Sequence, residues 1–145
     1  MRQWILALLL ACATLPANAE QLINIKDVEV HYSAFNSTFL TPQVAKSYKL
    51  TRNGYSAVLN ISVLDTSTAG KPAVEAKLSG QVKNLIGNMR ELEFSEVKEG
   101  NAIYYLAEFP ISNENEEDLS FDIDVNAGLK GAGKLRFTQK FYVEK

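Results

Sequence analysis

The chain has 145 residues with 15 basic and 17 acidic side chains, one histidine and one cysteine, and a formal net charge of −2. This mild acidity argues against nucleic acid or an anionic membrane as partner, because both attract clustered positive charge. The cysteine, Cys12, lies in a segment that we expect to be removed, so disulfides, thiol catalysis and cysteine-ligated zinc are excluded from the mature domain.

Residues 1–19 have the three parts of a cleavable signal peptide: a positive start, an apolar run over 4–13, and the sequence ANA before Glu20. The apolar run is shorter than the roughly 20 residues that cross a bilayer, and later apolar runs are interrupted by charges, so no membrane span is expected. We expect cleavage after Ala19, one mature domain over residues 20–145, and a periplasmic location. A lipoprotein acylated at Cys12 is the alternative; the apolar run before this cysteine is short.

The first predicted elements of the mature chain are a strand and a short helix. Alternation of apolar and polar residues predicts a strand over 27–35. A helix of two turns is predicted over 41–48, because Thr41 is a good N-cap, Pro42 suits the first helical position, and Val44 and Tyr48 are four residues apart.

The rest of the chain predicts strands at regular spacing. Alternation is clear over 55–63, 119–127 and 134–144, where Gln139 interrupts the apolar face, and weaker over 74–83 and 91–97. Residues 102–111 are apolar on both faces, which indicates a central strand or a covered outer face. Glycine-containing turns lie between these strands. About seven strands predict an all-β, immunoglobulin-like two-sheet sandwich with one short helix; a barrel is the alternative.

Three features have a possible chemical role and a simpler structural explanation. His31 is the only histidine, so a histidine-dependent hydrolase would need it together with carboxylates; the simpler interpretation is a polar residue on a strand. The glycine-rich stretch 128–133 precedes a strand rather than a helix, which favours a hairpin loop over a phosphate-binding loop. The acidic run 113–118 lacks the ligand spacing of a calcium-binding loop, which favours a solvated loop between two strands. No metal or other cofactor is expected.

The segment 31–48 is the candidate binding region. It combines a histidine, large aromatic residues and small polar side chains in an irregular connection, and such segments on a β scaffold often bind ligands. The candidate ligand- or partner-binding residues are His31, Tyr32, Asn36, Ser37, Thr38 and Gln43. The alternative is a sandwich corner whose aromatic side chains close the end of the core.

Residues 31–45, HYSAFNSTFLTPQVA, resemble the signature of domain-of-unknown-function family 4426, which comprises small periplasmic proteins of gammaproteobacteria. The stretches 58–63 (VLNISV), 102–105 (AIYY) and 137–142 (FTQKFY) are similar too, so the resemblance covers nearly all of the mature chain. It implies a periplasmic, immunoglobulin-like β protein and no particular activity.

The favoured hypothesis is a non-enzymatic binding or protein-interaction module of the cell envelope. It would act through an exposed sheet edge that accepts a partner strand, or through the segment 31–48. The partner would be an envelope protein or a small ligand, and the protein itself a monomer or weak dimer. The alternative is a small periplasmic hydrolase that uses His31 and carboxylates.

Overall fold

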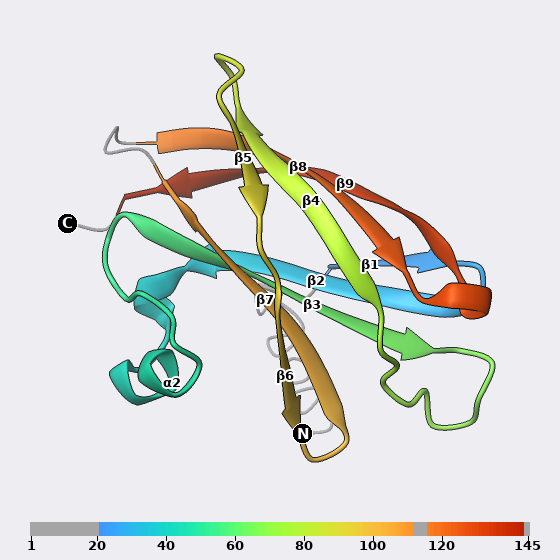
Figure 1. The fold of residues 1–145 in the computed structure, drawn as a ribbon. Coiled ribbons are helices and arrows are strands. Elements are labelled where there is room, and N and C mark those ends of the chain that lie inside the picture. The colour runs from blue at the N-terminus through green and yellow to red at the C-terminus, as the bar shows by residue number, and fades with distance from the viewer. Residues whose placement is uncertain (1–20, 112–115, 144–145) are drawn as a thin grey trace, which may run out of the picture.

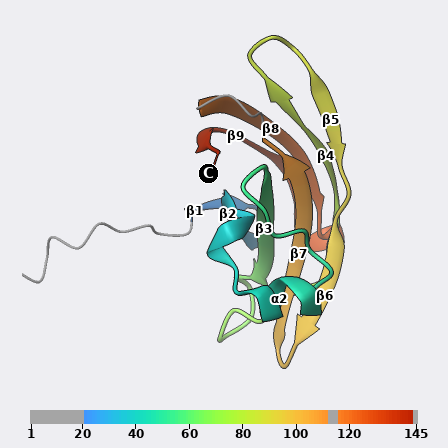
Figure 2. The ribbon, with the colours of Figure 1, turned by 90° about the vertical axis from the view of Figure 1, so that its left-hand side faces the viewer.

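The computed structural model describes residues 21–111 and 116–143, and most of these residues form β-strands (Figure 1). One antiparallel sheet has the strand order β1–β2–β3–β7–β6, with bounds Gln21–Ile25, Val28–Asn36, Ser56–Asp65, Ala102–Pro110 and Ser95–Glu99. The second has the order β5–β4–β8–β9, with bounds Met89–Leu92, Lys77–Asn84, Glu116–Asn126 and Ala132–Tyr142. Figure 2 shows the sheets as two curved layers.

This architecture confirms the predicted all-β sandwich with one short helix. The described residues hold nine strands rather than about seven, for two reasons. An additional strand, β1, pairs with β2, and the strand predicted over 91–97 is divided into β5 and β6, which belong to different sheets. The expected signal peptide, Cys12 and residues 113–115 of the acidic run lie outside the described residues. No helix within the described part of the chain is long and apolar enough to cross a membrane.

The core fills the space between the inner faces of the two sheets. Aromatic rings from both sheets meet at its centre: Phe121 stacks on Phe137 with ring centroids 4.4 Å apart, and Phe109 approaches Phe121 edge-on at 5.2 Å. Tyr32 packs on the other side of Phe137, with a centroid distance of 4.6 Å. Such pairs add to the stabilisation from burial, and they join the two layers into one core.

The chain crosses between the sheets in the continuous segment 89–99. Its first part, β5, pairs with β4 of the four-stranded sheet, and its second part, β6, pairs with β7 of the five-stranded sheet. Leu92, at the end of β5, and Phe94, between the two strands, point into the core. The two sheets are therefore joined covalently along this side of the sandwich.

On the opposite side, side chains rather than a backbone ladder bridge the gap between β2 and β9. Gln139 Nε2 donates a hydrogen bond to the carbonyl oxygen of Ala34 at 2.8 Å, and Asn36 Nδ2 donates to that of Tyr142 at 2.5 Å. Strand β1 pairs only with residues 28–32, so it does not reach this part of β2. The interruption of the apolar face at Gln139 thus has a structural reason.

The predicted short helix is present as α2 (Pro42–Ser47), preceded by the 3-10 turn η2 (Ser37–Phe39). The Thr41 side chain accepts a hydrogen bond from the Val44 amide at 3.2 Å, as expected of an N-cap. The chain then continues through Tyr48 and Leu50 to β3. In Figure 1, α2 lies to one side of β6, across a gap.

Loops at the other end of the sandwich converge on Asp65, a buried carboxylate. It accepts hydrogen bonds from Ser67 and Thr68 of its own loop and from Lys130 Nζ at 2.7 Å. Lys130 belongs to the 3-10 turn η3 (Gly128–Lys130) between β8 and β9. Close by, Gly131 packs against the backbone of Ile25, where a Cβ atom would lie 2.6 Å from the carbonyl oxygen. The glycine-rich stretch is thus a hairpin loop, and Gly131 permits the close approach of β1.

Candidate functional site

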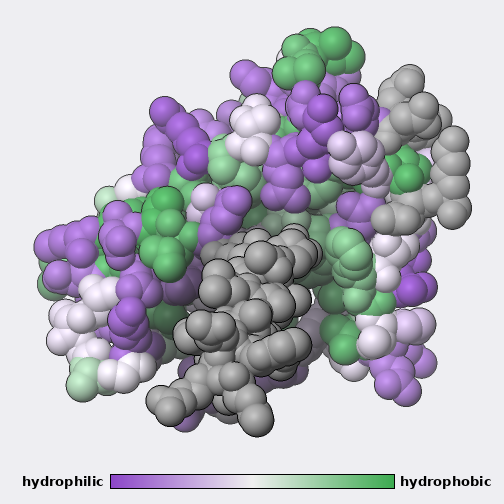
Figure 3. Space-filling model, turned by 180° about the vertical axis from the view of Figure 1, so that it is seen from behind, coloured by the Kyte–Doolittle hydropathy of each residue, from purple (hydrophilic) through white to green (hydrophobic). Residues whose placement is uncertain are grey.

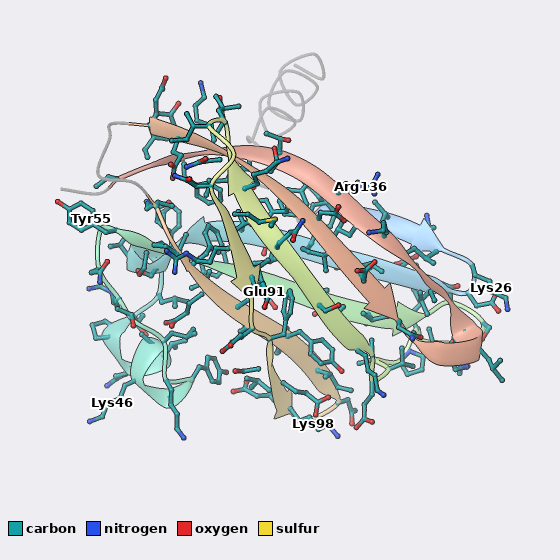
Figure 4. All side chains as sticks on the ribbon, turned by 45° about the horizontal axis from the view of Figure 1, so that its top comes forward. Lys26, Lys46, Tyr55, Glu91, Lys98 and Arg136 are labelled. Carbon is teal, nitrogen blue, oxygen red and sulfur yellow. The ribbon has the colours of Figure 1, made fainter. Side chains whose placement is uncertain are left out.

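The candidate site is a groove of about 660 Å³ between the end of α2 and the edge strand β6, here called the β6 groove. One wall is formed by residues 47–50, and the other by Glu93 and β6. Leu106 and Glu108 of β7 also line it. Figure 4 shows Lys46 on α2 and Lys98 on β6, on the two sides of this region.

Strand β6 presents its edge to the groove. All five of its residues, Ser95 to Glu99, line the groove, whereas a strand seen face-on would present only alternate residues. Within the described residues β6 pairs only with β7, and its backbone forms no other hydrogen bond. Such an edge leaves unpaired N–H and C=O groups that can pair with another chain.

The turn after β6 identifies which backbone groups are free. Glu99 and Ala102 face each other across the two-residue turn at Gly100, whose φ of 57° fits a tight hairpin. The residues that close such a hairpin form a hydrogen-bonded pair, and this pairing recurs at every second residue. The backbone groups of Glu96 and Lys98 therefore point away from β7, toward the groove.

The side chains of β6 divide between two faces. Ser95, Val97 and Glu99 lie on the outer face of the sheet, opposite Leu106, Tyr104 and Ala102 of β7. Leu106 is only 7% exposed although it lies on this outer face, because the two walls of the β6 groove, residues 47–50 and β6, cover it. The apolar character of both faces of residues 102–111, which predicted a central strand or a covered one, thus has an explanation in this cover.

Hydrogen bonds tie the wall of the groove to the sheet. Tyr48, at the end of α2, donates its hydroxyl to Glu99 Oε1, and the Thr51 amide donates to Glu108 Oε1. The hydrogen bond to Glu99 raises the pKa of Tyr48, because the nearby carboxylate disfavours a phenolate. These two hydrogen bonds hold the end of α2 and the residues after it against the sheet, one at Glu99 and one at Glu108.

The inner side of β6 carries a compensated set of charges. Lys98 Nζ lies 2.5 Å from Glu75 and 3.8 Å from Glu96. Its hydrogen bond to Glu75 lowers the pKa of that carboxyl and raises the pKa of Lys98. Tyr105 donates its hydroxyl to Glu96 at 2.9 Å, and burial raises its pKa.

The structure places the six residues of the sequence-based site in different environments. His31 is half-buried on the outer face of β2, where its Nε2 lies 3.0 Å from Glu29 Oε1. Tyr32 belongs to the core, and Asn36 bridges to β9. Ser37 is fully buried, and its hydroxyl bonds to the backbone of Asn53.

The other two candidate residues lie nearer the surface. Thr38 is half-buried, and its carbonyl accepts a weak hydrogen bond from Arg52 at 3.4 Å; Gln43 is exposed on α2. The six side chains therefore do not converge on one cavity, and their role in binding stays a prediction. Three of them, Tyr32, Asn36 and Ser37, have clear structural roles.

His31 takes part in a small network at the surface, in which it shares the carboxylate of Glu29 with Lys71. Lys71 Nζ lies 2.8 Å from Glu29 Oε2, and Lys71 and then His31 hold the pKa of Glu29 below its usual range. Among the residues that the structure describes, no three histidine, cysteine or acidic side chains are grouped to hold a metal ion.

A second hollow, of about 650 Å³, lies beside the turn between β4 and β5. Leu85, Ile86 and Met89 are 79%, 83% and 60% exposed there, and Figure 3 shows a hydrophobic cap at this projecting end. Glu116 and the β8 residues that follow it also line the hollow; they come directly after residues 112–115 in the sequence, which are not among the described residues. The β6 groove is the better-defined candidate site, because its lining residues are not adjacent in sequence to residues 112–115.

Sequence reasoning missed the β6 groove, because its walls come from segments that are far apart in the chain. Two signals pointed toward it: the apolar residues on both faces of 102–111, and the helix that ends at Tyr48. Neither signal shows that 89–99 changes sheets and leaves an edge beside α2.

Known structures share this fold. A DUF4426 family protein from Pseudomonas aeruginosa is 38% identical to this chain, with a TM-score of 0.75, and the match covers 89% of this chain and 99% of that one. FetP from uropathogenic Escherichia coli strain F11 is 12% identical, with a TM-score of 0.56 and coverage of 88% and 96%. A copper-bound FetP variant is 13% identical, with a TM-score of 0.50 and coverage of 86% and 95%.

At 12–13% identity, the likeness to FetP shows the fold alone. A search of curated proteins found no match. The family model named domain of unknown function DUF4426 matches residues 23–144. Together with the relative from Pseudomonas aeruginosa, this match confirms the resemblance that residues 31–45 carry. The chain belongs to the DUF4426 family.

Proposed function

We propose that this protein is a non-enzymatic interaction module of the cell envelope, and that it binds a partner by adding one of the partner's strands to the free edge of β6. The observation that carries the proposal is the unpaired edge of β6 in an open groove. Strand addition of this kind derives affinity from main-chain hydrogen bonds and specificity from neighbouring side chains. The five residues of β6 offer an edge about 17 Å long.

The groove is suited to binding because its walls are held in place without the partner. The contacts of Tyr48 with Glu99 and of Thr51 with Glu108 connect α2 and its following loop to the sheet. A site held in this way loses less entropy when a partner binds than a flexible one. The length of β6 also fits a short extended segment.

An exported, periplasmic location supports an envelope role and belongs to the same proposal. It rests on the signal-peptide pattern of residues 1–19 and on the family resemblance. The copper of the FetP variant is not carried over to this chain. His31 is the only histidine, it contacts Glu29, and no metal-holding group occurs among the described residues.

The experiment compares two substitutions at one edge residue. Lys98→Pro removes a backbone N–H that points into the groove, and proline is tolerated at such an edge position. Lys98→Ala removes the same ammonium group but keeps the N–H. A photo-crosslinking amino acid at position Ser95 reports contact in living cells, and one at Arg136, exposed on β9, serves as the control position.

We expect the probe at Ser95 to form a defined crosslink that persists in Lys98→Ala and is lost in Lys98→Pro, while the probe at Arg136 forms none. Circular dichroism must show that both variants are folded. Strand addition at β6 is refuted if the crosslink survives Lys98→Pro, if Arg136 gives the same product, or if Ser95 gives none. The hydrolase alternative is tested separately by His31→Ala, since full retention of any hydrolytic activity excludes histidine-based catalysis.

A further inference from the structure

We propose that the partner strand carries lysine or arginine at alternate positions, so that every second side chain meets the carboxylates on the outer side of the β6 groove. This inference rests on the strand addition proposed above and specifies the chemistry of the partner. Side chains of an added strand alternate between the two faces of the sheet. The charges on the two sides of β6 therefore select the two sets of partner side chains separately.

The outer side carries an excess of negative charge. Glu93, just before β6, Glu99, at the end of β6, and Glu108 of β7 all line the groove. Because Leu92 and Phe94 point into the core, Glu93 lies on the outer face, as Glu99 does. Against these three carboxylates, the wall formed by residues 47–50 offers one ammonium group, that of Lys49; the other lysine that lines the groove, Lys98, is paired on the inner side.

The contacts of these carboxylates leave their charge uncompensated. Glu99 accepts a hydrogen bond from the Tyr48 hydroxyl and Glu108 accepts one from the Thr51 amide, and both donors are neutral. Glu93 is exposed and makes no hydrogen bond or ion pair within the described residues. The carboxylates at positions 99 and 108 are therefore oriented but not neutralised, which is the arrangement that attracts a cation.

The inner side differs, because its charges are already paired. Lys98 lies between Glu75 and Glu96, and Glu96 also accepts a hydrogen bond from Tyr105. A partner cation on this side would compete with Lys98 for the same carboxylates. We therefore expect small neutral side chains at the partner positions that face inward, and cations at those that face outward.

The test uses blocked seven-residue peptides, followed by NMR through the amide signals of β6. The first peptide is Thr-Lys-Thr-Lys-Thr-Lys-Thr; two others replace lysine with glutamine or with glutamate. A fourth has the same composition as the first with its lysines in one block, Thr-Thr-Lys-Lys-Lys-Thr-Thr. The protein variant Glu93→Gln/Glu99→Gln removes two charges while keeping side-chain oxygens, including the one that accepts from Tyr48. Glu91→Gln, on β5 outside the groove, is the matched control.

We expect the alternating lysine peptide to shift the β6 amides and to bind about tenfold more tightly than the glutamine peptide, a difference of about 1.4 kcal/mol. The double variant should lose most of this preference and Glu91→Gln none of it. Higher salt should reduce the preference, because the carboxylates are exposed.

The outcomes separate this inference from the proposed function. If the glutamine, glutamate or block peptide binds as tightly as the alternating lysine peptide, and Lys98→Pro abolishes that binding, strand addition stands and the charge pattern is wrong. If the lysine peptide binds equally well to Lys98→Pro, its binding is non-specific attraction and both proposals fail. Both also fail if no peptide shifts the β6 amides at millimolar concentration.

Discussion

The substitution Gln139→Glu tests the side-chain bridge between β2 and β9 with almost no change in shape. The Gln139 amide donates to the Ala34 carbonyl at 2.8 Å in a half-buried position. A carboxylate at this position cannot donate, and it would place negative charge against a carbonyl oxygen. Removing one partner of a buried hydrogen bond costs about 1–3 kcal/mol, so we expect a loss of about 2 kcal/mol. In a domain of this size that lowers Tm by roughly 6–10 °C.

The loss should depend on pH, with a sign that follows from the same geometry. The folded state disfavours the charged form of the new carboxyl, which raises its pKa above that of the unfolded chain. The penalty is therefore absent below about pH 4, where the protonated carboxyl can donate to Ala34, and is fully present at neutral pH. Differences in Tm from the wild type at pH 7 and pH 3.5 measure this effect.

Gln43→Glu provides the matched control, because Gln43 is exposed on α2 and the charge change is the same. A carboxylate in the first turn of a helix is neutral to slightly stabilising. We therefore expect the Tm of this control to equal or slightly exceed that of the wild type at pH 7. If Gln139→Glu unfolds at the same temperature as the control, or if its deficit is the same at both pH values, the bridge does not stabilise the sandwich.

Three further predictions concern stability. Hydrogen bonds from Lys130 and then Ser67 hold the pKa of Asp65 well below the ordinary value of 3.8, so the ionised carboxylate stabilises the fold above pH 3.8 and this stabilisation is lost progressively at lower pH. Asp65→Asn should therefore lower Tm at pH 7, by an amount that shrinks toward pH 2 in thermal scans. Gly131→Ala should lower the urea midpoint more than Gly87→Ala, because a Cβ at Gly131 meets backbone at 2.6 Å, whereas at Gly87 it meets nothing within 4 Å and only the positive φ is strained; equal midpoints would contradict the close packing. Asn60→Val should leave Tm unchanged or raise it, because Asn60 Oδ1 is buried without a hydrogen-bond partner among the described residues; a clear fall in Tm would show that this oxygen has a partner.

Much of the fold was predictable because its signals are local. Alternation identified most of the expected strands, the apolar stretch 102–111 indicated a further one, and Thr41 and Pro42 identified the helix, since N-caps and strand faces depend on neighbours in sequence. The division of 89–99 between two sheets was not predictable, because it depends on which strands flank each half. The extra strand β1 is short and follows the expected signal peptide, so its pairing with β2 left no clear pattern.

The candidate site was harder to predict, because residue type does not reveal direction. Tyr32 and Asn36 are polar-tipped residues in an irregular region, which favoured a binding role, yet both point inward and are 8% and 7% exposed. Alanine at both positions is thus expected to lower Tm, which would prevent a separate test of binding. Conversely, Glu93 and Glu99 resemble ordinary surface acids in the sequence, and only their position on one side of an open edge distinguishes them.

The passage of one continuous segment through both sheets has a mechanical consequence. A partner strand hydrogen-bonded along β6 and pulled parallel to it would load several ladder bonds at once, in shear, instead of opening them one after another. Because β6 continues directly into β5, the tension would pass to both sheets and to Leu92 and Phe94, whose side chains are embedded between them. A short edge strand would thereby resist pulling better than its length alone suggests.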